Sequence, residues 1–115
     1  MSVTVFITYD LVPGVTKEQY WEWSREIDQP MASRQPGVLS YEIVWIDGTG
    51  TGEAPGQVVE VIEAESWEAW QKVNEYPEMQ AAVASFFEIA EKSSIRVFYG
   101  TGIDVLVLGP YVIRQ

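Results

Sequence analysis

Titratable side chains in apolar surroundings are the first places in this sequence where chemistry could occur. Asp28 lies at the edge of the apolar stripe of a predicted helix, and Tyr9 lies on the apolar face of a predicted strand. A carboxyl group half-buried beside aromatic rings has a raised pKa and can act as a general base or acid. We therefore predict acid/base roles for Asp28 and Tyr9. The alternative role of Asp28 is structural, as a hydrogen-bond acceptor in the turn after Pro30.

Residue types that enzymes commonly use are missing. The chain contains no histidine and no cysteine, which excludes imidazole proton transfer, thiolate nucleophiles, disulfides and cysteine metal sites. The glycines of segment 48–52 precede neither a lysine nor a predicted helix, so a phosphate-binding loop is not predicted. No spacing of acidic residues indicates a metal site. We expect a protein without metal or cofactor, in which any catalysis depends on orienting a reactive substrate.

Charged residues within predicted strands have two possible roles. Glu42 and Glu60 stand in otherwise apolar strands, and a buried acid needs a partner, which Arg96 could supply as a structural ion pair. Alternatively, Arg34 and Arg96 could bind an acidic ligand through bidentate hydrogen bonds. The sequence leaves both roles open.

Helix signals place these residues on elements. Thr16 and Gln19 form a capping-box pattern at the start of the first helix, and Pro30 should bend or end that helix just before it. Its apolar stripe is predicted to contain Tyr20, Trp23, Ser24, Ile27 and Met31. Ser66 is a predicted N-cap, and Pro77 suits the first position of a further helix.

Strand signals complete the order strand, helix, strand, strand, helix pair, strand. The predicted strands span residues 3–9, 38–46, 58–62 and 95–99. This order predicts one α+β domain over residues 1–115, with a ferredoxin-like split βαβ core over residues 3–100. Such a core has a four-stranded antiparallel sheet with helices on one face.

Two of the strands are apolar on both faces, which predicts a homodimer. One face of segment 38–46 is predicted to carry Leu39, Tyr41, Ile43 and Trp45, and its other face Val38, Val44 and Ile46. Helices of one small chain cover only one face of a sheet, so a second copy of the chain is expected to cover the other. The result is a dimeric α+β barrel, with residues 101–115 as a C-terminal strand or arm at the dimer interface.

The charge balance bears on partners and location. With 17 acidic and 7 basic residues the formal charge is -10, which disfavours binding to nucleic acid or to anionic membranes. No apolar stretch reaches the ~20 residues that cross a bilayer, and the N-terminus lacks the pattern of a secretory signal. We expect a cytoplasmic protein.

The segment TYDLVPGVTKEQYWEWSREIDQP, residues 8–30, resembles RedY-like or HapK-like proteins of the dimeric α+β barrel superfamily. The resemblance rests on LVPGV at residues 11–15, on Tyr20-x-x-Trp23, and on DQP at residues 28–30. Weaker similarity continues through residues 35–38, 59–61 and 76–77, and the whole covers residues 3–100. Members of this group accompany bacterial bisindole and prodigiosin-type pigment pathways.

The resemblance implies a ligand pocket between the sheet and the helices of each subunit. Superfamily members include cofactor-free polyketide cyclases, cofactor-independent monooxygenases and haem-degrading enzymes. The histidines of the cyclases fall at Val5 and Met79 of this sequence and their tyrosine at Val73, so that machinery is absent, and no histidine is available to bind haem.

Mostly apolar side chains are expected to line this pocket, although the same residues could simply fill a core. Such a pocket suits a hydrophobic or aromatic ligand. The predicted binding residues are Val5, Ile7, Trp23, Ile27, Gln57, Val59, Val73, Met79, Val83, Arg34 and Arg96.

Three functions follow as hypotheses. The first is a cofactor-free enzyme of bacterial secondary metabolism that carries out cyclisation, rearrangement or proton transfer on an aromatic or conjugated intermediate. The second is a non-catalytic homodimer that binds and protects a hydrophobic intermediate. The third is a cofactor-independent monooxygenase.

Overall fold

Four antiparallel strands form one sheet in the computed structural model, which describes residues 2–32 and 34–103. Their order across the sheet is β2-β3-β1-β4, and each pair of neighbours is antiparallel. This order confirms the predicted split βαβ fold. The strands are β1 (Val3–Tyr9), β2 (Val38–Trp45), β3 (Val58–Ala64) and β4 (Arg96–Gly100).

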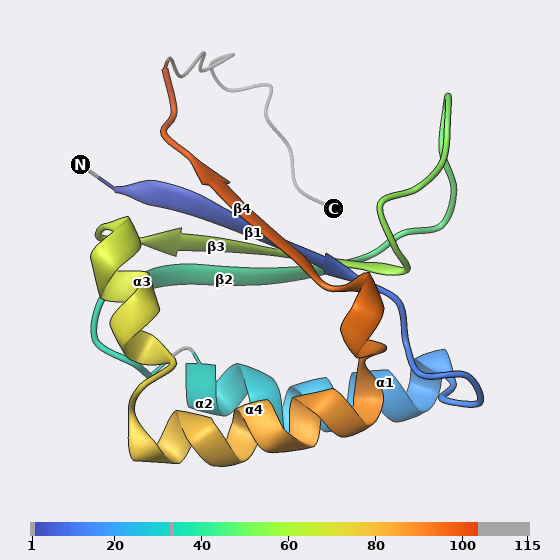
Figure 1. The fold of residues 1–115 in the computed structure, drawn as a ribbon, viewed down its shortest axis with the longest axis horizontal. Helices are drawn as coiled ribbons and strands as arrows, with labels where there is room; N and C mark the ends of the chain where they lie inside the picture. Colours follow the sequence, from blue (N-terminus) through green and yellow to red (C-terminus); the bar gives the residue numbers. More distant parts are fainter. Residues whose placement is uncertain (1, 33, 104–115) are drawn as a thin grey trace, which may run out of the picture.

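The helices cover one face of this sheet (Figure 1). Within the described residues, no helix is long and apolar enough to cross a membrane. The predicted arm at residues 101–115 lies almost wholly outside the described residues, which end at 103. The helical elements are α1 (Lys17–Trp23), η1 (Ser24–Asp28), α2 (Gln29–Ala32), α3 (Trp67–Val73), α4 (Pro77–Ile89) and η2 (Lys92–Ser94).

The helix starts are those that the sequence predicts. The Gln19 backbone N–H donates to Thr16 Oγ1 over 3.1 Å, while the Thr16 N–H donates to Gln19 Oε1 over 2.8 Å, which completes the capping box of α1. The Ala69 N–H donates to Ser66 Oγ at α3, and Pro77 is the first residue of α4.

The first helix continues through Pro30 instead of ending there. Its interruption takes the form of a π turn, η1, in which the Gln29 N–H donates to the Ser24 carbonyl five residues earlier. The wider turn inserts one residue, so the buried stripe runs through Ser24, Asp28 and Ala32. Ile27 is 41% exposed, and its predicted place on the buried face is wrong for this reason.

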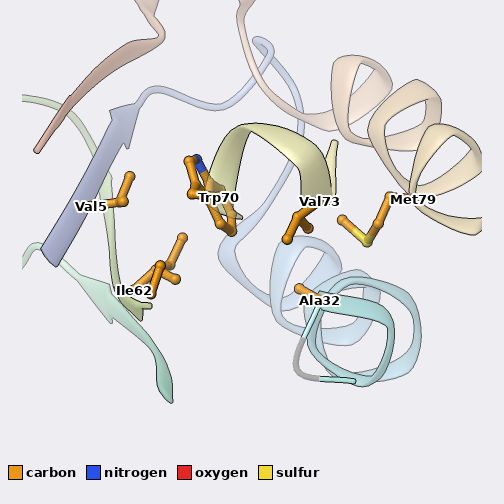
Figure 2. Close-up of a cluster of buried hydrophobic side chains, with 7 residues drawn as sticks. Val5, Ala32, Ile62, Trp70, Val73 and Met79 are labelled. Atoms are coloured by element: carbon orange, nitrogen blue, oxygen red, sulfur yellow. The ribbon is translucent and has the colours of Figure 1, made fainter. Parts of the chain in front are cut away.

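Two hydrophobic clusters fill the space between the sheet and the helices. The first joins Val5 and Ile62 of the sheet to side chains of α2, α3 and α4 (Figure 2). The second surrounds Tyr9 and Tyr20 near the start of α1. The buried members are Val5, Ala32, Ile62, Ala64, Trp70, Val73 and Met79 in the first cluster, and Tyr9, Leu11, Tyr20, Trp23, Val58 and Ala90 in the second.

The alternation of β3 decides which side chains face the helices. Its even-numbered residues, 58 to 64, are buried, and its odd-numbered residues are half-buried on the opposite, open face. Val59 therefore lies on the open face, which corrects its predicted lining role. In β2 the register shifts between Val38 and Ser40, and Leu39, predicted to share a face with Tyr41, is 58% exposed.

Candidate functional site

A cavity of about 730 Å³ lies between the helix-facing side of the sheet and the helices α2, α3 and α4. Its size is within the range of small-molecule sites, and most of its wall is apolar or aromatic. The lining residues are Ile7, Asp28, Ala32, Tyr41, Glu60, Trp67, Trp70, Gln71, Asn74, Glu75, Met79, Gln80, Ala82, Val83, Phe86, Phe87, Ile95 and Val97.

The structure brings part of the predicted site together. Asp28 of η1, Ile7 of β1, and Met79 and Val83 of α4 all line the cavity. Asp28 reaches it because the π turn rotates residue 28 onto the buried side of the helix. Helical wheel reasoning places Asp28 only at the edge of the apolar stripe, since it counts 3.6 residues in every turn.

Other predicted binding residues belong to the core or to the surface. Val5 and Val73 are fully buried in the first cluster and do not line the cavity. The Trp23 indole N–H donates to Ser85 Oγ over 2.9 Å and so joins α1 to α4. Ile27 faces outward as described above. The predicted binding roles of these residues are therefore corrected. Close packing between neighbouring elements leaves no space for a ligand beside the buried side chains.

The polar residues predicted to bind an acidic ligand also lie elsewhere. Gln57 Oε1 accepts from the Leu11 N–H over 2.7 Å, and Gln57 and Arg96 line a separate surface depression. Arg34 is exposed, with its guanidinium beside the Met31 sulfur. Neither arginine approaches the cavity, whose described lining contains no Lys or Arg. An acidic ligand in this cavity would therefore lack a cationic partner there.

A chain of hydrogen-bonded hydroxyl and carboxyl groups runs from the cavity wall into the core. The Tyr41 hydroxyl lies 2.7 Å from Asp28 Oδ2 and 2.8 Å from Glu60 Oε1. The Tyr9 hydroxyl lies 2.5 Å from Glu60 Oε2 and 2.6 Å from the Tyr20 hydroxyl. The chain thus links Asp28, Tyr41, Glu60, Tyr9 and Tyr20 in that order.

Glu60 is the most deeply buried acid among the described residues. Burial, and then the nearby charge of Asp28, raise its pKa to about 8, while its hydrogen bonds with Tyr9 and Tyr41 oppose this rise. The expected ion pair with Arg96 is absent. Arg96 lies opposite Thr8 in the strand register, so its exposed side chain is on the open face of the sheet, away from Glu60. Glu42, the other strand acid, is also exposed.

Asp28 has the titration behaviour that an acid/base group requires. Burial raises the pKa of its carboxyl to about 6, and the hydrogen bond from Tyr41 opposes part of this rise. Its Oδ2 atom accepts from Tyr41, and no hydrogen bond from another described residue reaches its Oδ1 atom. One carboxyl oxygen is therefore available to a molecule in the cavity.

Tyr9 differs from its predicted role. Its side chain is fully buried in the second cluster, does not line the cavity, and is hydrogen-bonded to a lining residue through Glu60. Burial raises the pKa of Tyr9 far above its ordinary value, and the pKa values of Tyr20 and Tyr41 are raised for the same first cause. All three phenols are therefore neutral hydrogen-bond donors across the physiological pH range. This corrects the assignment of Tyr9 to direct acid/base contact with a ligand.

Glu60 and Tyr41 were missed as site residues, although the sequence contained a usable signal. Both stand at positions that share a strand face with apolar residues, Glu60 with Val58 and Ile62, and Tyr41 with Ile43. A glutamate on a buried strand face needs hydroxyl or cationic partners. This need marks Glu60 as a candidate site residue, but it does not by itself choose between Arg96 and the tyrosines as partners.

The fold and the cavity define an α+β protein of the ferredoxin-like class, with a pocket between its sheet and its helices. The chain belongs to the HapK family: the family model described as "REDY-like protein HapK" matches residues 3–100. This confirms the resemblance seen in the sequence. A comparison with curated proteins finds no significant match.

Solved structures show the same fold. HapK from Hahella chejuensis is 18% identical, covers 91% of this chain and 96% of its own, and has a TM-score of 0.73. SnoaB, a cofactor-independent oxygenase from Streptomyces nogalater, is 10% identical, with coverages of 91% and 96% and a TM-score of 0.71. A dimeric ferredoxin-like protein of unknown function from Thermobifida fusca is 13% identical, with coverages of 87% and 90% and a TM-score of 0.67.

Proposed function

We propose that this chain is a cofactor-free enzyme of bacterial secondary metabolism that moves a proton on an aromatic or conjugated intermediate. Cyclisations and rearrangements of such molecules require a base to remove a proton and an acid to return it. The observation that carries the proposal is the Asp28 carboxyl, which lies in the wall of an apolar cavity with its pKa raised to about 6. At neutral pH this carboxyl is ionised. Its pKa is close to the pH of the solution, which favours proton transfer in both directions.

The cavity walls supply the second requirement, a fixed ligand orientation. Trp67, Trp70 and Phe86 present aromatic surface, while Gln71 and Asn74 provide amide groups that can bind a polar substituent. A flat ligand held against these rings would bring one of its C–H or O–H groups to Asp28. Orientation of this kind supports much of the rate when the catalytic groups are few.

Deuterium exchange into 2-tetralone tests the proposal with a neutral aromatic ketone. Asp28 would remove a proton from the carbon between ring and carbonyl, and the Asp28 carboxyl, after exchange with D2O, would return a deuteron. NMR should show protein-catalysed exchange that Asp28→Asn reduces by at least ~10²-fold. Glu26→Gln removes an exposed carboxyl from the same π turn and should exchange at the wild-type rate.

The two other functions are outcomes of the same experiment. Saturable binding of 2-tetralone with no exchange above the buffer rate would contradict the enzyme and support a carrier of hydrophobic intermediates. Consumption of oxygen with anthrone, a reduced polyaromatic compound, would support a monooxygenase. We consider this function because the fold is similar to that of the oxygenase SnoaB. In that reaction a substrate carbanion would react with oxygen directly.

We also propose that the protein is a homodimer joined through the open face of the sheet. Phe6 and Phe98 stack there with ring centroids 5.2 Å apart, and Phe98 is 51% exposed although it is large and apolar. Val44 adds a further exposed apolar side chain on the same face. Sedimentation velocity should give the mass of a dimer, and a monomer at micromolar concentration would contradict this proposal.

A further inference from the structure

The hydrogen-bonded chain beside the cavity contains more contacts than its phenols have protons. Four contacts join its five groups, namely Asp28–Tyr41, Tyr41–Glu60, Glu60–Tyr9 and Tyr9–Tyr20. Each contact needs one proton between its oxygens, and three tyrosine hydroxyls supply only three. The fourth proton must come from a carboxyl group. If both carboxyls were ionised, two lone pairs would face each other across one contact.

We propose that Asp28 and Glu60 form a pair that shares one proton through the Tyr41 hydroxyl, with Glu60 as its resting place. In that state Glu60 donates to Tyr41, and Tyr41 donates to Asp28, so the carboxylate faces the cavity. Glu60 is thus a positioning residue that acts on a ligand only through Tyr41 and Asp28.

The surroundings of the two carboxyls favour this assignment. Glu60 lies on the central strand β3, is 5% exposed, and has oxygen contacts only with tyrosines among the described residues. Asp28 has an oxygen free for the cavity, where a ligand can stabilise its charge. The order of the pKa values, about 8 for Glu60 and about 6 for Asp28, agrees with the geometry.

The pair can also present an acid to the ligand at the same pH. Glu60 would pass its proton to the Tyr41 oxygen while Tyr41 passes its own proton to Asp28. Two O–H bonds break and two form, and the charge of the pair stays at one negative unit. A ligand carbonyl would favour this second arrangement because it accepts a hydrogen bond from the Asp28 carboxyl, whereas a ligand hydroxyl would favour the first.

Few other charges reach the pair. Among the described lining residues of the cavity, the only other acid is Glu75, which is exposed at the end of α3. From β1 and α1 the facing titratable groups are the neutral phenols of Tyr9 and Tyr20. On α4 the nearby carboxyl of Glu78 accepts from the Gln35 side chain and does not line the cavity. The protonation states of Asp28 and Glu60 are therefore set mainly by the five hydrogen-bonded groups themselves.

Infrared spectra of the ligand-free protein test the proton sharing directly. At about pH 7, between the two pKa values, the wild type should show the carbonyl band of a protonated carboxyl, and this band should disappear as the pH passes about 8. Asp28→Asn should retain the band and Glu60→Gln should lack it. No such band in the wild type, or its loss in Asp28→Asn with retention in Glu60→Gln, would overturn the proposal.

Tyr41→Phe tests the bridge through the pH profile of deuterium exchange. Its hydrogen bond lowers the pKa of Asp28, so its loss should move the acid limb of the profile from about pH 6 to higher pH. Tyr99→Phe, on the exposed β4 strand, should leave the limb in place. A changed rate with an unmoved limb in Tyr41→Phe would overturn the bridge. The use of the pair in catalysis rests on the proposed function, but the infrared result does not, so the two can fail separately.

Discussion

The two faces of the sheet hold their polar groups in opposite environments. On the helix-facing side, Glu60 and Tyr41 are enclosed, and their polar atoms are bound within one hydrogen-bonded chain. On the open side, Glu42 and Arg96 are exposed beside apolar Phe98 and Val44. One face has polar groups inside an apolar wall, and the other has apolar groups among charges on a surface.

This difference determines what each face of the sheet can do. Buried polar groups that are all satisfied give a defined geometry and shifted pKa values, which suit chemistry on a bound molecule. Exposed apolar groups give area that a partner can cover, which suits association. Neighbouring residues of one strand therefore serve different purposes, and substitutions one residue apart should separate them.

The largest expected effect compares Ile62→Asp with Val61→Asp. Ile62 is fully buried against the helices, so an unpaired carboxyl there should cost more than ~4 kcal/mol of folding free energy and unfold the domain. Val61 lies on the open face, so Val61→Asp should keep the fold by circular dichroism and weaken the proposed dimer by at least ~10²-fold. Equal loss of structure in both variants would show that the faces do not differ.

The next effect concerns stability against pH. Glu60 has a pKa raised from 4.5 to about 8, so between these values the folded state keeps a proton that the unfolded state has lost. The contribution of Glu60 to the free energy of unfolding should therefore be fully present below about pH 4.5. It should be lost as the pH rises through about 8, a change of a few kcal/mol. Asp28 adds a smaller fall between 3.8 and about 6.

Urea denaturation at fixed protein concentration measures this slope. Glu60→Gln should flatten it, because the amide does not titrate. Glu26→Gln is the control, because this side chain is exposed in η1 on the helix side of the sheet, and it should keep the wild-type slope. A Glu60→Gln variant as pH-sensitive as the wild type would contradict the enclosed environment of Glu60.

The smallest effect tests the π turn that delivers Asp28 to the cavity. Ile27 is 41% exposed, so Ile27→Ser should cost no more than about 1 kcal/mol, whereas the matched Ile62→Ser should cost at least ~3 kcal/mol. Thermal or urea unfolding measures both. A regular α-helix would bury residue 27 and make the two costs similar.

The fold could be predicted from the sequence because local signals agreed with one another. The capping box at Thr16, the N-cap at Ser66 and Pro77 at the first turn of α4 placed the helices. The alternating pattern of residues 3–9 predicted β1, and the order of the elements along the sequence indicated the split βαβ arrangement. These signals act over a few residues, so no tertiary information was needed.

The site could be predicted only in part because it depends on irregular backbone and on contacts between strands. A single inserted residue in the π turn moved Asp28 inward and Ile27 outward. The partners of Glu60 come from β1 and β2, and no local pattern states which of Arg96, Tyr9 or Tyr41 will meet it. Asp28 was found because its own surroundings are aromatic, whereas Tyr41 resembled an ordinary apolar strand residue.

A carbon-13 NMR titration of labelled Asp and Glu carboxyls, with and without 2-tetralone, would show whether Asp28 is an acid/base group in the wall of the ligand cavity. We expect one aspartate signal, absent in Asp28→Asn, that titrates near pH 6 and shifts when 2-tetralone binds. This expectation would be contradicted if that signal titrated at the ordinary aspartate value, or if saturating 2-tetralone left it unmoved.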